Sequence, residues 1–281
     1  MNPRILTDVH LEQFKQHLIT NEKAAHTVEK YIRDVRAFAA FLDGRAVTKE
    51  LTVAFKQQLL EAGYAPASVN SMLASVNSLF VFLGWNDCRV KAIKRQRQIF
   101  CSEDKELTKA EYFRLLNAAK QKKNDRLNLI LQTICGTGIR VSELEYITVE
   151  AAQAGQAMVN CKGKTRVVFI VKELKKRLLQ YAKEKRIATG LIFVTRTGKP
   201  VSRTNIWREM KALCEAANVD PKKVFPHNLR HLFARTFYGL EKDIAKLADI
   251  LGHTSIDTTR IYIISTGREH RKRMECLHLV Q

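Results

Sequence analysis

Apolar side chains recur three or four positions apart in four successive segments of the N-terminal part of the chain. The positions are Leu11, Phe14 and Leu18 in the first segment, Val28, Tyr31, Ile32, Val35, Phe38 and Phe41 in the second, Leu51, Phe55 and Leu59 in the third, and Val69, Met72, Leu73, Val76, Leu79 and Phe80 in the fourth. This spacing places the apolar side chains on one helical face, which must be buried against another element. Gly44, Gly63 and Gly84 fall just past three of the expected helix ends, where a left-handed backbone is common. The pattern predicts four helices with short connections, packed as a small bundle.

Each of the four segments has a polar residue near its start that favours helix initiation. Short side chains with an oxygen accept a hydrogen bond from the free N–H groups of the first helical turn. The candidates for this capping position are Thr7 or Asp8, Thr27, Thr48 and Ser68. These residues set the expected starts of the four helices.

A basic run separates this bundle from the rest of the chain. Residues 89–97 read Arg-Val-Lys-Ala-Ile-Lys-Arg-Gln-Arg, and such a run is either a solvated linker or a contact to a polyanion. Beyond it, Thr108 and Glu111 have the spacing of a capping box, which opens a new helix. The expected domains are an N-terminal helical domain over 1–86, a basic linker over 87–104, and a second domain over 105–281 that ends in a C-terminal tail.

The second domain contains one pair of β-prone segments among several helical ones. Ala157–Cys161 and Arg166–Val171 flank Lys162-Gly163-Lys164, the pattern of a hairpin with a tight turn. A further short strand is predicted at Leu191–Val194. Helices are predicted at Asp125–Cys135, from Val141, and at Lys172–Lys185, Ser202–Ala217, His227–Phe237 and Asp243–Leu251. The fold class is therefore mainly α with a small antiparallel β-hairpin.

The balance of charges indicates a polyanionic partner. The chain of 281 residues has 48 Lys and Arg against 28 Asp and Glu, which gives a formal net charge of +20. Such a surplus repels itself in a compact fold unless a polyanion screens it, and nucleic acid is the commonest such partner. An anionic membrane surface is second, but no apolar run reaches the ~18 residues that a spanning helix needs. We therefore expect nucleic acid, and no membrane, as the partner.

Two further features predict a cytoplasmic protein, which a nucleic-acid partner would associate with the nucleoid. The first ten residues lack the apolar core of a secretory signal. The six cysteines are scattered and include no Cys-x-x-Cys pair, so they are expected to be reduced thiols.

Four segments of the second domain place polar residues beside turns or helix starts. They are Thr137-Gly-Ile-Arg-Val-Ser-Glu-Leu144, Cys161-Lys-Gly-Lys-Thr-Arg166, Pro226-His-Asn-Leu-Arg-His231 and Leu251-Gly-His-Thr-Ser-Ile-Asp-Thr-Thr-Arg-Ile-Tyr262. Taken singly, each has a structural explanation, such as an ion pair between Arg140 and Glu143 or a Tyr262 ring packed in a core. Their joint occurrence indicates chemistry on a phosphodiester.

Cleavage of a phosphodiester without a metal needs cations and a nucleophile. The transition state carries extra negative charge on five-coordinate phosphorus, and arginine binds its oxygens in a bidentate way that lysine cannot. Arg140 and Arg230 are the candidate cations, and Tyr262 is the candidate nucleophile. Because a free phenol has a pKa near ~10, a neighbouring base or nearby cations must assist the loss of its proton.

Three more residues are candidates for proton transfer and charge stabilisation. His227 lies three residues before Arg230, so a helix places both on one face. Lys162, on the predicted hairpin, is placed to protonate the leaving 5′-oxygen. His253 directly follows Gly252, where a helix is expected to end, and can donate a hydrogen bond to the phosphate.

These residues closely resemble the catalytic set of the tyrosine recombinase family, which includes phage integrases and Xer-type site-specific recombinases. The stretches T-G-I-R-V-S-E-L, P-H-N-L-R-H and L-G-H-T-S-I-D-T-T-R-I-Y are similar to the box motifs of that family. The resemblance covers the second domain from Leu107 to Tyr262, whereas the N-terminal bundle is less distinctive in sequence.

The resemblance implies a fold, a reaction and partners. It implies a SAM-like four-helix core-binding domain that clamps the DNA, followed by an α+β catalytic domain. The implied reaction is site-specific cleavage and rejoining of DNA strands through a 3′-phosphotyrosyl intermediate, with no metal and no cofactor such as ATP. The implied partners are double-stranded DNA, further copies of the chain in a homotetramer on two DNA sites, and in some cases a partner recombinase or accessory protein.

Roles are carried over residue by residue from this resemblance. Tyr262 becomes the nucleophile, Arg140 and Arg230 clamp the phosphate, Lys162 is the general acid, His227 and His253 assist proton transfer and charge stabilisation, and Glu143 supports Arg140 from behind.

Several alternatives stay open at this level. Lys164 stands in the same turn as Lys162 and is the alternative general acid. His227 and His231 have the spacing of a zinc pair, but Asn228 stands where a metalloprotease motif requires glutamate. A non-catalytic DNA-binding protein of the same fold and a type IB topoisomerase-like nicking-closing enzyme are the competing functions. Among recombinases, both a mobile-element integrase and a chromosome-resolving Xer-type enzyme fit the sequence.

Overall fold

The computed structural model describes residues 3–94, 105–161, 164–263 and 274–277, with the backbone alone at 161 and 164. Lys162 and the basic part of the C-terminal tail lie outside these ranges. The chain forms two compact units, Met1–Arg97 and Gln98–Gln281, each of which is described by itself. Among the described helices, none combines the length and the apolar character needed to span a membrane.

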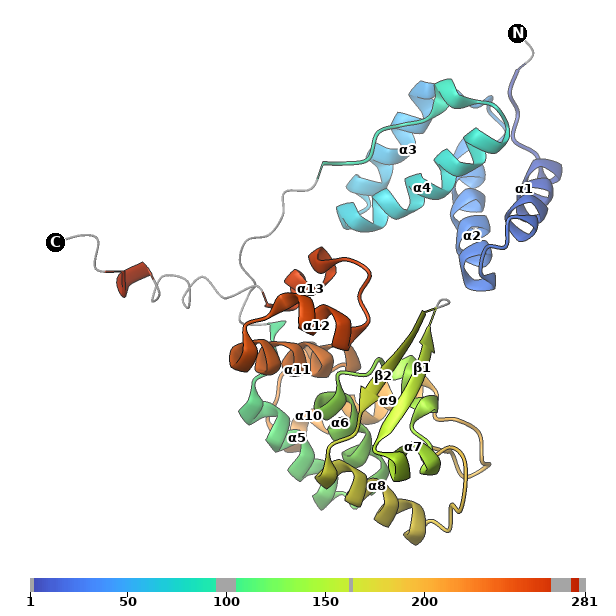
Figure 1. The fold of residues 1–281 in the computed structure, drawn as a ribbon. Coiled ribbons are helices and arrows are strands. Elements are labelled where there is room, and N and C mark those ends of the chain that lie inside the picture. The colour runs from blue at the N-terminus through green and yellow to red at the C-terminus, as the bar shows by residue number, and fades with distance from the viewer. Residues whose placement is uncertain (1–2, 95–104, 162–163, 264–273, 278–281) are drawn as a thin grey trace. The chain divides into compact units, whose positions relative to one another are not determined.

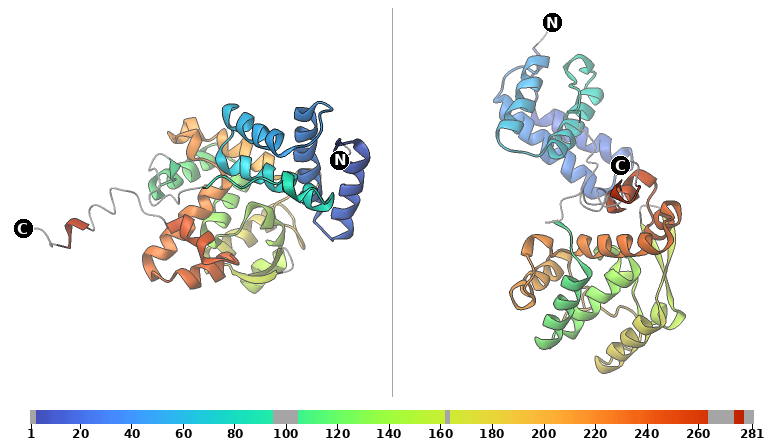
Figure 2. Two further views of the ribbon diagram at one scale, coloured as in Figure 1. Left: turned by 90° about the horizontal axis from the view of Figure 1, so that it is seen from above. Right: turned by 90° about the vertical axis from the view of Figure 1, so that its left-hand side faces the viewer.

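The predicted four-helix bundle is confirmed in the N-terminal unit (Figures 1 and 2). Its helices are α1 (Asp8–Thr20), α2 (Ala25–Leu42), α3 (Lys49–Glu61) and α4 (Pro66–Phe82), followed by a short 3-10 helix at Asn86–Cys88. Helix α2 packs against each of the other three helices, and α3 also packs against α4.

Aromatic side chains fill the centre of the bundle. The ring of Phe38 in α2 meets Phe55 of α3 and Phe80 of α4 edge to face, with centroid distances of 5.1 and 5.7 Å. This geometry brings the positive edge of one ring to the negative face of the other. The three residues come from three of the predicted apolar stripes, which confirms that these stripes face a common core.

Two of the four predicted helix caps are confirmed and two are wrong. Thr48 accepts a hydrogen bond from the backbone at the start of α3, and Thr7 forms a capping box at the start of α1. Thr27 and Ser68 instead lie in the first turns of α2 and α4, because both helices begin earlier than predicted. At α4 the reason is Pro66 in the first turn, whose fixed φ suits a helix start and whose missing N–H needs no cap.

The segment after the bundle is bound to α4 by two asparagines one heptad apart. The side chain of Asn77 accepts from the backbone N–H of Val90 at 3.0 Å and donates to its carbonyl at 2.9 Å. Asn70 makes the same pair of bonds with Ile93, at 2.7 and 3.0 Å. The first half of the predicted linker therefore lies along the N-terminal unit.

The second unit contains the predicted hairpin and a larger set of helices. Its elements are α5 (Lys109–Gln121), α6 (Asp125–Thr137), the 3-10 helix η3 (Val141–Tyr146), α7 (Val149–Ala154), β1 (Gln156–Cys161), β2 (Lys164–Phe169), α8 (Lys172–Glu184), α9 (Arg203–Lys211), α10 (Cys214–Ala217), the 3-10 helix η4 (Pro221–Lys223), α11 (Pro226–Glu241), α12 (Ile244–Leu251) and α13 (Ile256–Ile263). The strands pair antiparallel, with Gln156 opposite Phe169 and Cys161 opposite Lys164. The capping box of Thr108 and Glu111 opens α5 as predicted.

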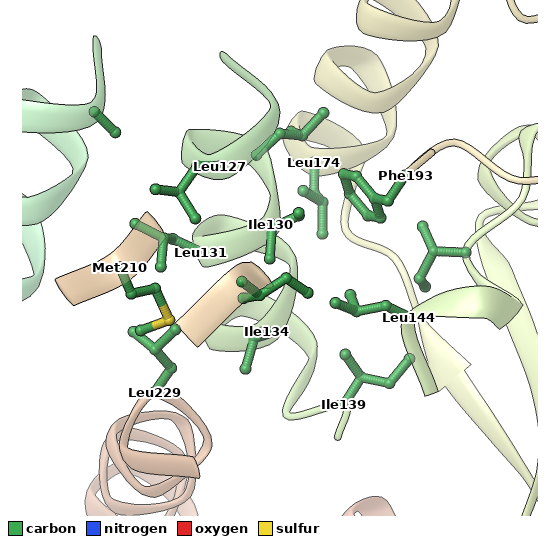
Figure 3. Close-up of a cluster of buried hydrophobic side chains, with 14 of the residues drawn as sticks. Leu127, Ile130, Leu131, Ile134, Ile139, Leu144, Leu174, Phe193, Met210 and Leu229 are labelled. Atoms are coloured by element: carbon green, nitrogen blue, oxygen red, sulfur yellow. The ribbon is translucent and has the colours of Figure 1, made fainter. Parts of the chain in front are cut away.

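Helix α6 is the central element of this unit. Figure 3 shows its side chains Leu127, Ile130, Leu131 and Ile134 surrounded by residues from other elements, among them Leu174 of α8, Met210 of α9 and Leu229 of α11. The end of α6 is therefore held rigidly from several sides, and the residues that follow it inherit a fixed position.

Three predicted elements of the second unit differ from the structure. The predicted strand at Leu191–Val194 is wrong, because the segment makes only isolated bridges, one of them to Thr148 at the N-cap of α7, where pairing cannot continue. The helix predicted from Val141 is a short 3-10 helix, and Ser202–Ala217 divides into α9 and α10.

Helices α11, α12 and α13 pack against one another at one side of the second unit (Figure 1). Helix α11 also packs against α6. Gly252 ends α12 in the left-handed conformation, with φ of 65°, and the chain then turns directly into α13. The ends of α6 and α12 and one face each of α11 and α13 are thereby brought together.

Candidate active site

Five of the six predicted catalytic residues come from the elements that meet at this place, and the sixth, Lys162, lies outside the described residues. The structure places Arg140 at the N-cap of η3, His227 and Arg230 in α11, His253 just after α12, and Tyr262 in α13.

Tyr262 is enclosed by three histidines. Its hydroxyl lies 3.3 Å from Nε2 of His227, and its ring stacks on that of His231 with a centroid distance of 4.1 Å. The ring of His253 lies 5.2 Å away on centroids, and Tyr262 as a residue is only 5% exposed. The phenol is therefore held by ring contacts, while its hydroxyl faces an imidazole nitrogen.

The three imidazoles are neutral at pH 7. Burial, together with the charges of Arg230 and other nearby arginines, lowers the pKa of His227. Burial and neighbouring positive charge lower the pKa of His231 and of His253 to about 4. A neutral His227 has a nitrogen that can accept the proton of the Tyr262 hydroxyl.

Arg230 is the largest fully buried side chain among the described residues, with 1% exposure. Its Nη1 donates to the carbonyl of Gly138 at 2.5 Å, and its Nη2 donates to the carbonyl of Leu251 at 2.6 Å and to His253 at 2.9 Å. Nε has no partner within the described part of the chain. Burial and the nearby Arg140 lower the pKa of Arg230 to about 10, so the guanidinium keeps its charge at neutral pH and has donors left for an anion.

The hydrogen bonds of His253 define its tautomer. A guanidinium only donates, so Nε2 of His253 accepts from Arg230 at 2.9 Å. The ring proton is therefore on Nδ1, which donates to the hydroxyl of the buried Thr259 at 2.8 Å. In this state His253 orients Arg230 through Nε2, the atom that would donate to a phosphate in the other tautomer.

Arg140 is held by a buried carboxylate, as the sequence predicted. Glu143 accepts from Nη1 of Arg140 at 2.8 Å and from its backbone N–H at 2.9 Å. Burial raises the pKa of Glu143, but the hydrogen bonds from Arg140 and the charge of Arg166 outweigh burial and lower it. The second ion pair of this carboxylate, from Arg166 in β2, was not predicted.

A cavity of about 560 Å³ opens beside these residues. It is lined by Ile139, Arg140, Val141, Ser142, Arg203, Thr204, Trp207, Phe225, Pro226, His227 and Arg230. Three arginines, Arg140, Arg203 and Arg230, and the imidazole of His227 thus line one cavity, where an oxyanion would meet concentrated positive charge. Arg203 and Trp207 of α9 were not predicted as site residues.

Sequence reasoning missed contacts that depend on how elements meet. His231 was considered as half of a zinc pair, whereas its ring stacks on Tyr262. No group of three or more potential metal-ligating side chains occurs in the ranges that the structure describes. The signal for His231 was present, since it stands one helical turn after His227, but nothing in the sequence showed which helix would face it.

Comparisons with known proteins cover both units. Residues 105–268 match the model described as the Phage integrase family, and residues 11–87 match the model described as Phage integrase, N-terminal SAM-like domain. The tyrosine recombinase XerA of Thermococcus kodakarensis is 29% identical over 281 residues, which cover 96% of each chain.

Two solved structures share the fold. The lambda integrase(75-356) dimer bound to a COC' core site is 19% identical, with a TM-score of 0.75 over 94% of this chain and 97% of that chain. A lambda integrase tetramer bound to a Holliday junction is 18% identical, with a TM-score of 0.75 over 93% of this chain and 78% of that chain. At these identities the likeness shows the fold alone.

Proposed function

The chain belongs to the phage integrase family, and from that premise we propose that it recombines DNA at specific sites by cutting and rejoining strands through a covalent bond to Tyr262. The observation that carries this proposal is the hydroxyl of Tyr262 at 3.3 Å from His227, which lines the same cavity as Arg140 and Arg230.

Arg140 and Arg230 are proposed to bind the non-bridging oxygens of the scissile phosphate. They approach the cavity from different elements, Arg140 after α6 and Arg230 from α11. Both guanidiniums are fixed by hydrogen bonds that they donate, Arg140 to Glu143 and Arg230 to the carbonyls of Gly138 and Leu251. Donors fixed in this way stabilise the charge that develops on phosphorus without reorganising.

Tyr262 is proposed to attack phosphorus while His227 takes its proton. The new bond joins the phenolic oxygen to phosphorus, and the bond from phosphorus to the 5′-oxygen breaks, which leaves a 3′-phosphotyrosyl linkage and a free 5′-hydroxyl. Rejoining reverses these steps: a 5′-hydroxyl attacks phosphorus and Tyr262 departs. One phosphodiester is exchanged for another ester of similar energy, so ATP is not needed.

The proton for the leaving 5′-oxygen is proposed to come from Lys162, with Lys164 as the alternative. Lys164 begins strand β2, which adjoins α12, and Lys162 stands two positions before it in the sequence. A duplex with sulfur in place of the scissile 5′-bridging oxygen distinguishes them, because a thiolate leaves without a proton. We expect Lys162→Met to cleave normal DNA slowly and the sulfur duplex at nearly the wild-type rate, whereas the same rescue in Lys164→Met alone would reassign the role.

The partners follow from the same premise. Double-stranded DNA is the proposed substrate, which the basic charge of the chain favours. The proposed active form is a homotetramer on two DNA sites, because a family member of the same fold is a tetramer on a Holliday junction. A Xer-type role, with a partner recombinase or accessory protein where one exists, is supported by the likeness to XerA over almost the whole chain. The proposed location is the cytoplasm, at the nucleoid.

Trapping the covalent intermediate tests the proposal. Wild type, Tyr262→Phe and Tyr181→Phe are each incubated with a library of nicked duplexes in EDTA, and SDS-resistant adducts are isolated and sequenced. Tyr181 is the control because it is a buried tyrosine of the same unit that packs in the core around α6. We expect adducts from wild type and Tyr181→Phe, none from Tyr262→Phe, and similar DNA affinity for all three.

Other outcomes would point to the competing functions. An adduct from Tyr262→Phe would remove Tyr262 as the nucleophile. Tight DNA binding with no adduct from wild type would favour the non-catalytic DNA-binding protein. Adducts without sequence preference, accompanied by relaxation of supercoiled plasmid, would favour the topoisomerase-like enzyme.

A further inference from the structure

Arg166 of β2 connects its own strand to α12 and to η3, next to the proposed active site. Its Nη1 donates to the carbonyl of Ile250 in α12 at 2.8 Å, and its Nη2 donates to Oε2 of Glu143 in η3 at 2.5 Å. The Arg166 side chain is 12% exposed and that of Glu143 is 3% exposed. A guanidinium in such surroundings is fixed, because both ends of its fork have partners.

The carboxylate of Glu143 transmits this contact to Arg140. One oxygen accepts from Nη1 of Arg140, while the other is shared by the backbone N–H of Arg140 and by Arg166. Arg166 thus fixes the rotation of the carboxylate and balances its charge. Without Arg166, a buried carboxylate would have one guanidinium partner and would draw Arg140 away from an anion in the cavity.

The end of α12 leaves space for the side chain of Arg166, because residue 252 is a glycine. A Cβ on Gly252 would lie 2.5 Å from Cδ and 2.7 Å from Nε of Arg166, closer than side-chain carbons approach other heavy atoms. The carbonyl of Gly252 in turn accepts from Nη2 of Arg140 at 3.4 Å. The next carbonyl after Ile250 belongs to Leu251 and accepts from Arg230, so the same stretch of backbone touches all three arginines.

We propose that Arg166 is a positioning residue for DNA cleavage, which holds Glu143 and the end of α12 so that Arg140 is aligned on the scissile phosphate. This inference rests on the proposed function. Arg166 does not line the cavity, so it acts through Glu143 and Arg140. A purely structural ion pair would stabilise the fold equally well but would leave the rate of cleavage unchanged once the protein is folded.

The test compares Arg166→Lys with a matched control, Arg126→Lys. Arg126 also joins a carbonyl and a carboxylate, those of Val194 and Glu209, but neither Arg126 nor Glu209 lines the cavity. The rate of adduct formation is measured in single turnover at saturating DNA, on a nicked duplex bearing a recovered site, together with Tm and DNA affinity. We expect Arg166→Lys to cleave ~10-fold more slowly or worse, since small misplacements of a binding group have large effects on rate, and Arg126→Lys to cleave at the wild-type rate.

A double-mutant cycle with Glu143→Gln shows whether Arg166 acts through that carboxylate. The amide no longer carries the charge that Arg166 balances, so the two effects should not multiply. We expect the double variant to be within ~3-fold of the slower single variant. Fully multiplicative effects, or a wild-type rate in Arg166→Lys, would overturn the inference.

The outcomes remain informative if Arg166→Lys does not fold. Gly252→Ala then disturbs the same contact from the other side and is expected to slow the adduct rate as well, whereas a wild-type rate in that variant would contradict the inference. Failure of the proposed function is distinct from all of these results, because wild type itself would then form no adduct.

Discussion

The hydroxyl of Tyr262 and Nε2 of His227 lie 3.3 Å apart, although 35 positions separate the two residues in the chain. The contact joins α13 to the first turn of α11 and turns a buried phenol towards a neutral imidazole. Burial and the charges of Arg230 and Arg140 lower the pKa of His227, so this nitrogen stays free of a proton at pH values where an ordinary histidine begins to charge.

The first prediction concerns the pH dependence of cleavage. Because neutral His227 is the base, the rate should be constant down to pH ~6.5 and fall only below it, as the imidazole takes up a proton. His227→Gln should be slower by at least ~100-fold at neutral pH and should lack this acidic decline. Single-turnover adduct formation between about pH 5 and 8 measures both effects, with DNA binding recorded at each pH as the control. A His227→Gln variant with the wild-type profile would show that another group is the base.

A second prediction follows from the donors of Arg230. Lysine keeps a charge but cannot donate to Gly138, Leu251 and a phosphate in one plane. Arg230→Lys should therefore form adducts at least ~100-fold more slowly while keeping most of its DNA affinity. Arg126→Lys serves as the control, because its ion pair with Glu209 lies elsewhere in the same unit. A rate near that of wild type would remove Arg230 from the site.

Much of the fold could be predicted because a helix that buries one face has apolar residues three or four positions apart in its sequence. The stripes that contain Phe38, Phe55 and Phe80 identified three helices and the face that each buries. Helix starts were harder to predict, because a proline such as Pro66 begins a helix without any polar cap. The strand expected at Leu191–Val194 failed for another reason: strand pairing needs a partner, and the sequence does not show which segment will lie alongside.

The features of the active site also divide into those that the sequence predicted and those that it could not. Local motifs predicted which residues belong together, since His227 and Arg230 share one face of α11 and the end of α12 precedes His253. Contacts between different elements have no corresponding motif in the sequence. The stacking of His231 on Tyr262 and the bond from His253 to the Thr259 hydroxyl depend on the angle at which helices meet, which tertiary packing sets.

The third prediction concerns stability at acid pH. His231 and His253 have pKa values of about 4 in the folded chain, whereas in the unfolded chain they take up protons near ~6.5. The contribution of these two histidines to the free energy of unfolding should therefore be fully present above pH ~6.5 and be lost as the pH falls towards 4. The reason is that the unfolded state binds more protons than the folded state in that window. Urea unfolding at several pH values measures this loss. His231→Phe keeps a ring against Tyr262 without titrating, so its stability should depend less on pH; an unchanged dependence would contradict the assignment.

The fourth prediction concerns the segment bound to α4. The side chains of Asn70 and Asn77 each offer one donor and one acceptor to the backbone of the segment, as a neighbouring strand would. Each of these hydrogen bonds contributes about 0.5–1.5 kcal/mol to stability. The double variant Asn70→Ala/Asn77→Ala should release this segment, so that trypsin cuts the folded protein faster after Arg89 and Lys91. Mass spectrometry of the fragments identifies the cuts. Gln57→Ala is the control, because the side chain of Gln57 donates to its helical neighbour Glu61. Equal cleavage in both variants would show that the asparagines do not hold the segment.

The fifth prediction compares two glycines with the same left-handed backbone, Gly138 at φ 66° and Gly155 at φ 73°. A Cβ at Gly138 would lie 2.5 Å from the ring of Phe233, whereas at Gly155 the nearest atom is the carbonyl oxygen of Ile170 at 3.9 Å. Both alanine variants carry the backbone strain of about 1–2 kcal/mol, but only Gly138→Ala adds overpacking of about 1–3 kcal/mol.

The two variants should also differ in cleavage, because the carbonyl of Gly138 accepts from Arg230. Gly138→Ala is expected to unfold at lower urea concentration than Gly155→Ala and to form adducts more slowly at saturating DNA, since a shift of this carbonyl moves the guanidinium that binds the phosphate. Gly155→Ala should retain the wild-type rate, because its backbone lies between α7 and β1, away from the cavity. Equal rates in the two variants would mean that Arg230 keeps its position without the Gly138 carbonyl, and that the carbonyl of Leu251 together with His253 is sufficient to hold it.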